Sequence, residues 1–247
     1  MNSFMIAILS DFGNSEYLGV MKGAIFTVSN DARIVDLCNE VNPHQMIEGA
    51  WILLNSYRYF PKGTIFLCVV DPGVGSKRKC IAIRTKNYFF VGPDNGLMFP
   101  AANEDGVVES IELSSEKASN TFHGRDVFAR AAALIDLKRP FSSIGKMAMI
   151  KSKFKFHLNK DEGQIVRIDI FGNIITNIPH SGAKAYGVIL KNKKCQMDFY
   201  ATYNDAPTNV LFLILGSSNT LEISLKNSSA ALELMAKSGE KITIRQK

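Results

Sequence analysis

The stretch with the clearest structural meaning lies near the start of the chain: FMIAILSDFG, residues 4–13. An unbroken apolar run from Phe4 to Ser10 leads directly into a short polar turn that contains a glycine. Runs without polar alternation are typical of strands buried on both faces, so we expect a parallel strand here rather than a signal peptide. The apolar residues that follow recur at helical spacing, at Leu18, Met21, Ile25 and Val28.

The same alternation of strand and helix continues to about residue 140. Further strands are predicted at Arg33–Leu37, Thr64–Val70, Cys80–Arg84, Tyr88–Val91 and Val107–Leu113. Helices are predicted from Pro43 to Tyr57 and over Asp126–Leu137. This order predicts an α/β amino-terminal domain with a mainly parallel sheet, which we assign to residues 1–150.

The composition changes at residues 146–160, KMAMIKSKFKFHLNK, which hold five lysines and no acid. A solvated connector is the first interpretation, and a nucleic-acid contact is the alternative. Short alternating segments separated by turn residues follow, at Gln164–Ile170, Ala185–Leu190, Gln196–Ala201, Val210–Leu215, Leu221–Leu225 and Lys241–Arg245. They predict a small all-β, barrel-like carboxyl-terminal domain over residues 160–247.

Composition excludes several classes of protein. The chain has 247 residues, 46% hydrophobic and 21% charged, with a formal net charge of +6 at pH 7. These values are those of a globular protein, and no apolar run reaches the roughly eighteen residues that a membrane span needs. The four cysteines show no C-x-x-C spacing, so we expect free thiols, no metal site and a cytoplasmic location.

Recognised signatures for other enzyme classes are absent from the sequence. It contains no GxGxxG, Walker A, HExxH or G-x-S-x-G motif. This argues against a dinucleotide oxidoreductase, a P-loop NTPase, a zincin and an α/β-hydrolase.

Polar residues follow the predicted strands of the first domain, where ligands of open α/β sheets bind. Asp11 ends the first strand and could accept hydrogen bonds from a ribose diol or cap the next helix. Asp71 lies in the rigid loop VDPGVG, and a bend would bring Arg78 back to it, as a functional pair or as a structural salt bridge. His123 precedes a predicted helix and could act as a general base or be incidental. The turn Pro93-Asp94-Asn95-Gly96 is interpreted as support for a neighbouring loop.

Two loops of the second domain carry polar side chains. Asp169, Asn173 and Asn177 could line a pocket, and the loop Gly216-Ser217-Ser218-Asn219 offers amide groups for a base edge or a carboxylate. Ordinary hairpin turns are the alternative for both loops.

Taken together, the motifs resemble one family. The matching segments are Ser10–Gly13, Met21–Gly23, Val70–Arg78, Pro93–Leu97, Thr121–Asp126, Asp169–Asn177, Leu221–Ile223 and Ser229–Ala231. In order and composition they are similar to the S-adenosyl-L-methionine (SAM) hydrolases, also called SAM hydroxide adenosyltransferases, which are relatives of the fluorinating and chlorinating enzymes.

The resemblance implies an α/β domain, a barrel-like domain and a homotrimer whose active sites lie between the first domain of one subunit and the second domain of its neighbour. It implies conversion of SAM and water to adenosine and methionine, without a cofactor, a nucleic-acid partner or a membrane. The implied catalytic residues are Asp71, Arg78 and His123. The implied substrate contacts are Asp11 for ribose, Asp169 and Asn173 for the methionine part, Asn177 and Ser217 for adenine, and His44.

The resemblance also bears on the nucleophile. The halogenating relatives lack the Asp-Arg-His set that this chain keeps, so we expect water to be the nucleophile. We expect His123 and Asp71 to hold this water and to help remove its proton, and Arg78 to orient Asp71. A SAM-dependent halogenase and a non-catalytic SAM- or adenosine-binding module are the alternatives. In the loop after Gly216-Ser217, this chain has Ser218-Asn219 where many family members have a glycine. The predicted adenine contacts in this loop can therefore differ from those of the family. Because SAM is itself cationic, the net charge of +6 gives no favourable steering, and recognition falls to local acids.

Overall fold

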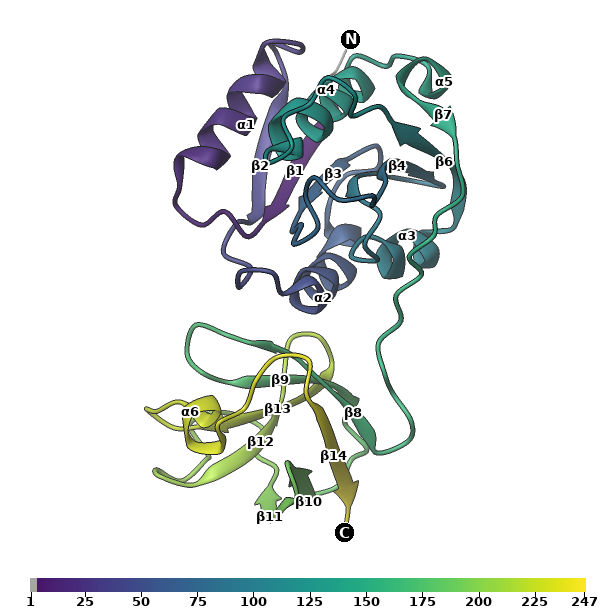
Figure 1. Ribbon diagram of the computed structural model, residues 1–247. Coiled ribbons are helices and arrows are strands. Elements are labelled where there is room, and N and C mark those ends of the chain that lie inside the picture. Colours follow the sequence, from purple (N-terminus) through teal and green to yellow (C-terminus); the bar gives the residue numbers. More distant parts are fainter. Residues whose placement is uncertain (1–3) are drawn as a thin grey trace. The chain divides into compact units, whose positions relative to one another are not determined.

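The computed structural model describes residues 4–247 and divides the chain into two compact units, one up to Lys155 and one from Phe156 to Lys247 (Figure 1). Each unit has its own sheet and its own apolar core. No helix among the described residues is long and apolar enough to cross a bilayer.

The first unit is built on a sheet with the strand order β2-β1-β3-β5-β4-β6-β7. Its strands are β1 (Met5–Ser10), β2 (Arg33–Cys38), β3 (Ile65–Val69), β4 (Cys80–Thr85), β5 (Phe89–Pro93), β6 (Val107–Leu113) and β7 (Lys146–Met147). The four strands β2, β1, β3 and β5 pair in parallel. β4 is antiparallel to both β5 and β6, so β6 points in the same direction as the parallel four. The mainly parallel sheet predicted from the sequence is confirmed.

Helices cover both faces of this sheet (Figure 1). α1 (Glu16–Phe26) and α4 (Arg130–Asp136) lie on one face, and α2 (Met46–Ser56) and α3 (Phe99–Asp105) lie on the other. Short helical turns occupy η1 (Tyr57–Tyr59) and α5 (Phe141–Ile144). The predicted helix Asp126–Leu137 begins slightly earlier, with the π-helical turn η2 (Gly124–Ala129). α3 was not predicted because it is short and has a proline, Pro100, in its first turn.

The second unit is a fully antiparallel sheet with the order β11-β10-β14-β8-β9-β13-β12. Its strands are β8 (Glu162–Ile168), β9 (Ile174–Pro179), β10 (Ala185–Leu190), β11 (Lys193–Asp198), β12 (Leu211–Leu215), β13 (Thr220–Leu225) and β14 (Lys241–Gln246). A bridge between Phe199 and Leu213 joins the chain after β11 to β12, so the two edges of the sheet approach each other. Helix α6 (Ala230–Leu234) adds Ala230 and Ala231 to the enclosed core. The all-β, barrel-like prediction is confirmed.

Three strands of this unit differ from the sequence prediction. β8 begins and ends two residues before the predicted Gln164–Ile170. β9 was not predicted, because Asn177 and Pro179 have low strand propensity. β11 starts three residues before the predicted Gln196, with Lys193 and Lys194. It is an edge strand, where exposed lysines prevent pairing with other chains, and its composition therefore does not look like that of a core strand.

Candidate active site

The topology of the first unit brings its candidate residues to one edge of the sheet. β1 and β3 are parallel and end at this edge, where Asp11 and Asp71 follow them. β4 runs in the opposite direction and therefore begins at the same edge, two residues after Arg78. His123 lies immediately before η2. Carboxyl edges of this kind are where open α/β sheets bind ligands.

Arg78 is the centre of a buried polar cluster at this edge. Its Nε donates to Oδ1 of Asp71 at 2.9 Å, and its Nη2 donates to Oδ2 of the same carboxylate. Nη2 also lies 2.8 Å from Nδ1 of His123. The side chains of Arg78 and Asp71 are only 10% and 7% exposed, so this ion pair is largely shielded from water. The guanidinium thus connects the two other members of the predicted catalytic set.

The electrostatics of the cluster determine the protonation of His123. Burial alone would lower the pKa of Arg78, but its hydrogen bonds and ion pair with Asp71 raise the pKa overall, so the guanidinium stays charged. Burial and the Arg78 charge lower the pKa of His123, which favours the neutral imidazole. Because Arg78 can only donate, Nδ1 of His123 must accept, and the ring proton resides on Nε2. Nε2 has no hydrogen-bond partner among the described residues.

Glycine at position 75 lets two loops of the cluster approach each other. Gly75 has a φ of +76°, and a Cβ atom there would lie 2.4 Å from the carbonyl oxygen of Asn120. No other residue fits both the left-handed conformation and the contact without strain. The loop that carries Asp71 therefore packs directly on the loop that leads to His123.

The turn at residues 93–96 supports these loops, as the sequence predicted. Asn95 Nδ2 donates to the carbonyl oxygen of Val70, next to Asp71, at 2.8 Å. The carboxylate of Asp94 accepts from the backbone N–H groups of Lys151 and Ser152, at 2.9 and 3.0 Å. The lysine-rich segment is thus attached through its backbone, while its lysine side chains are exposed.

Asp11 and His44 also meet at this edge. Oδ2 of Asp11 accepts from the backbone N–H of His44 at 3.0 Å, and His44 has a φ of +67°. Ser15, not Asp11, precedes the first residue of α1, so the helix-capping alternative for Asp11 does not apply. Asp11 is half-buried, and its second oxygen can accept from a ligand.

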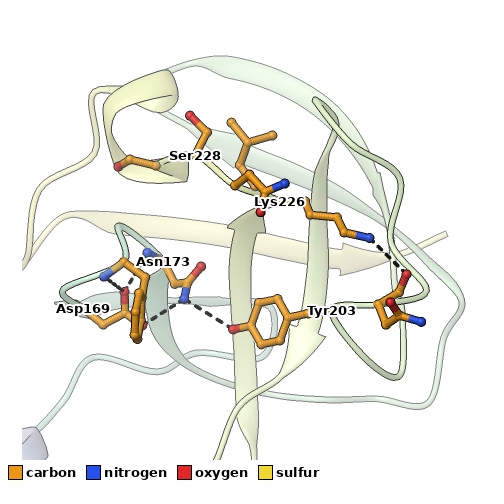
Figure 2. A pocket seen from close by; sticks show the side chains of 10 residues that line it. Asp169, Asn173, Tyr203, Lys226 and Ser228 are labelled. Carbon is orange, nitrogen blue, oxygen red and sulfur yellow. Dashed lines mark hydrogen bonds between the residues drawn. The ribbon is translucent and has the colours of Figure 1, made fainter.

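The second unit contains a cavity of about 860 Å³ beside the β8–β9 turn and the end of β13 (Figure 2). Two predicted residues, Asp169 and Asn173, line it together with the aromatic side chains Phe171 and Tyr203. Two rings with a carboxylate and an amide make a wall suited to a polar ligand group that carries a positive charge.

Hydrogen bonds hold the polar wall of this cavity in place. Oδ1 of Asp169 accepts from the backbone N–H groups of Phe171 and Asn173, both at 2.9 Å. Nδ2 of Asn173 donates to Oδ2 of Asp169 at 2.9 Å and to the hydroxyl of Tyr203 at 3.3 Å (Figure 2). Gly172 has a φ of +82°, and a Cβ atom there would lie 2.1 Å from Oγ of Ser229. The turn is therefore packed tightly against the start of α6.

Lys226 fixes the loop on the other side of the cavity. Its Nζ donates to the carbonyl oxygen of Asn204 at 3.2 Å (Figure 2). It also donates to the carbonyl oxygen of Ala206 at 3.2 Å. This loop carries Tyr203. The ammonium group is thus directed to the loop backbone, and it restrains the ring that lines the cavity.

The predicted residues Asn177 and Ser217 are not among those that line this cavity. Oδ1 of Asn177 accepts from the backbone N–H of Gln164 at 2.7 Å, and its Nδ2 donates to the carbonyl of His157 at 2.9 Å. Ser217 is exposed in the turn between β12 and β13. No group of three or more potential metal ligands occurs within residues 4–247.

Several residues around these sites have no role predicted from the sequence. Tyr203, Phe171 and Lys226 line the cavity from loops, where no periodicity indicates which way a side chain points. Glu222 of β13 is 8% exposed, and burial and the nearby Asp169 carboxylate raise its pKa to about 7. Glu222 lies between two core residues, Leu221 and Ile223. Strand alternation therefore predicts that its side chain points away from the core.

Comparisons with known proteins cover both units. The sequence models of the SAM hydroxide adenosyltransferase N-terminal and C-terminal domains match residues 6–145 and 163–243. A protein from Methanocaldococcus jannaschii named (R)-S-adenosyl-L-methionine hydrolase is 36% identical, over 93% of this chain and 92% of its own. One of the same name from Thermus thermophilus is 30% identical, over 95% and 96%. A fluorinase from Nocardia brasiliensis is 27% identical over 74% of each chain.

A solved structure, described as an uncharacterized conserved protein from Thermotoga maritima, has the same fold. It superposes with a TM-score of 0.87 at 33% identity, covering 97% of this chain and 100% of its own. Both domain models match, and two relatives are 36% and 30% identical along nearly the full length, so this chain belongs to the SAM hydroxide adenosyltransferase family.

Proposed function

We propose that this protein hydrolyses SAM to adenosine and L-methionine, with water attacking C5′ of the ribose. The observation that carries the proposal is the buried Asp71–Arg78–His123 cluster, which leaves Nε2 of His123 and one lone-pair position on each Asp71 oxygen for a water molecule. The relatives named (R)-S-adenosyl-L-methionine hydrolase support it.

The chemistry of the substrate sets what the site has to do. A sulfonium leaves as a neutral thioether, so the departing methionine needs no general acid. Water needs to be held in line with the C5′–S bond, in a pocket that excludes other water. As the C–O bond forms and the C–S bond breaks, the positive charge moves from sulfur to the attacking oxygen.

The protonation states of the cluster assign separate roles to Asp71 and His123. The oxygen that has bonded to C5′ is a protonated alcohol, a strong acid, so a carboxylate can take its proton. We assign this step to Asp71. His123 donates from Nε2 to the water oxygen and holds it in place, because its Nδ1 is already engaged by Arg78. Proton transfer is thus late, and one proton is released to solvent in each turnover.

Local acids supply the attraction for a cationic substrate. We propose that Asp11 accepts hydrogen bonds from the ribose diol, and that Asp169 and Asn173 hold the methionine part. Phe171 and Tyr203 offer rings at the same cavity. The contacts of Asn177 and Ser217 with adenine, and of His44 with the ligand, stay predictions.

We further propose a cytoplasmic homotrimer with active sites at subunit interfaces, acting on a small molecule without a cofactor, a nucleic acid or a membrane. Family membership supports the trimer, and four free cysteines support a reducing compartment. Sedimentation velocity tests the assembly: the proposal predicts a single species of three chains, and a monomer at micromolar concentration contradicts it.

Turnover tests the proposed function directly. The protein is incubated with SAM in halide-free buffer, in chloride and in fluoride, and the products are separated by chromatography. Equal adenosine and methionine in all three buffers are expected. A 5′-halo-adenosine that appears only with halide would identify a halogenase, and saturable SAM binding without product would identify a binding module. The Arg78→Lys variant serves as the loss-of-function control.

A further inference from the structure

Cys80 occupies the space between Arg78 and His123. Nη1 of Arg78 donates to Sγ of Cys80 at 2.9 Å, and the same sulfur lies 3.5 Å from Nδ1 of His123. The residue is 3% exposed. The sequence predicts a free thiol in an apolar run, whereas in the structure Cys80 contacts two members of the polar cluster.

A neutral thiol suits both of these neighbours. Burial raises the pKa of the Cys80 thiol, so it remains protonated at neutral pH. A guanidinium can only donate a hydrogen bond, and Nδ1 of neutral His123 can only accept one. The sulfur lone pairs accept from Arg78, and the S–H can donate to His123. An alanine or valine side chain at this position could do neither.

We propose that Cys80 is a positioning residue of the Asp71–Arg78–His123 cluster. It holds the Nη1 edge of the guanidinium and gives Nδ1 of His123 a second donor, which keeps the ring proton on Nε2. The catalytic consequence rests on the proposed function, because only there does the Nε2 proton hold the attacking water. The effect on His123 itself does not depend on that function.

Cys80 lies on a strand that is held in place on both sides. Cys80 is the first residue of β4 and pairs with Pro93 of β5 on one side and with Leu113 of β6 on the other. Arg78 and Asp71, in contrast, lie on the loop between β3 and β4. The Cys80 side chain, on a strand paired on both sides, therefore restrains the Arg78 side chain, which lies on a loop.

The competing explanation is that Cys80 only fills space, since it also belongs to the apolar cluster of the first unit. Cys68 provides a matched control for that role. It is fully buried in β3 of the same sheet, and its sulfur lies 3.8 Å from the carbonyl oxygen of Phe66. Removing either sulfur leaves a similar cavity, but only removal of Cys80 takes contacts from the cluster.

Nuclear magnetic resonance of the histidine rings gives a test that needs no activity. The chain has four histidines, and the His123→Gln variant assigns the His123 signals. The charged groups that face this ring are Arg78, Asp71 and Asp126. In Cys80→Ala and Cys80→Val, loss of the donor should raise the pKa of His123 by about half a unit or more. Cys80→Ser should return it towards wild type, and Cys68→Ala should leave it unchanged.

Two kinetic readouts complete the experiment. Because Cys80 is not placed against the substrate, Cys80→Val should lower kcat by about tenfold and leave KM within about twofold, with partial recovery in Cys80→Ser. Melting temperatures verify that the variants are folded. Titration curves and kcat values of Cys80→Ala and Cys80→Val that match those of Cys68→Ala would overturn the proposal. If the wild-type protein does not hydrolyse SAM, the proposed function fails, and the titrations alone decide the role of Cys80.

Discussion

Replacement of Glu222 by glutamine gives a pH-dependent change in stability that follows from the structure. Glu222 is 8% exposed, and burial and the carboxylate of Asp169 raise its pKa from 4.5 to about 7. Between these two pH values the folded protein keeps a proton that the unfolded chain has already released. Folding is therefore linked to proton uptake at this residue, and stability falls as the pH rises through this range.

The size of the effect follows from the two pKa values. A carboxyl that titrates near pH 7 when folded and near 4.5 when unfolded costs about 3 kcal/mol of stability once the pH exceeds 7. Glutamine has nearly the same shape and carries no charge. Glu222→Gln should therefore gain about 3 kcal/mol relative to wild type between pH 4.5 and pH 8, with most of the gain below pH 7.

Urea unfolding at pH 4.5, 5.5, 6.5 and 8, followed by circular dichroism, measures this difference. Titration of all other groups is shared by the two proteins and cancels in the comparison. Glu233→Gln, which changes an exposed glutamate of the same unit, is the matched control and should show little pH dependence. A Glu222→Gln difference that stays constant within about 0.5 kcal/mol over this range would show that Glu222 does not keep its proton in the folded protein.

Three further substitutions test the roles of Arg78, Gly172 and Lys226. Arg78→Lys cannot keep the forked contact with Asp71 and also reach His123, so kcat should fall by about a hundredfold, with KM little changed in steady-state assays. Gly172→Ala introduces a Cβ atom 2.1 Å from Ser229 at a φ of +82° and should cost about 2 kcal/mol in urea unfolding, whereas Gly187→Ala, with no atom within 4 Å, should cost nothing. Lys226→Met removes two hydrogen bonds from the loop that carries Tyr203 and should raise KM by about fivefold, with kcat unchanged; an unaltered KM would exclude Lys226 as a support of the cavity.

The architecture was predictable because the strands of both sheets have clear apolar patterns in the sequence. Continuous apolar runs such as Phe4–Ser10 became parallel strands, and Val107–Leu113 matched β6 residue for residue. Prediction failed where a segment is short or carries polar residues for another reason. α3 starts at a proline-containing turn, and β11 carries edge lysines, so neither shows the pattern of a buried element.

The candidate site was predictable to the extent that its residues follow strands. Asp71 and Arg78 are close in sequence and flank a glycine-rich loop, so their pairing could be anticipated. The contacts of Cys80 could not, because strand alternation does not distinguish a thiol that packs against apolar side chains from one that contacts a guanidinium. Tyr203 and Lys226 reach the cavity from a loop and a strand end, through contacts that only the tertiary structure creates.

In the proposed reaction, water held by Asp71, Arg78 and His123 attacks C5′ of SAM. Turnover in water enriched in oxygen-18, with mass analysis of the adenosine, tests this step. We expect one labelled oxygen per adenosine, at the 5′ position, and loss of this product in Arg78→Lys. Unlabelled adenosine, or label at any position other than the 5′-oxygen, would contradict it.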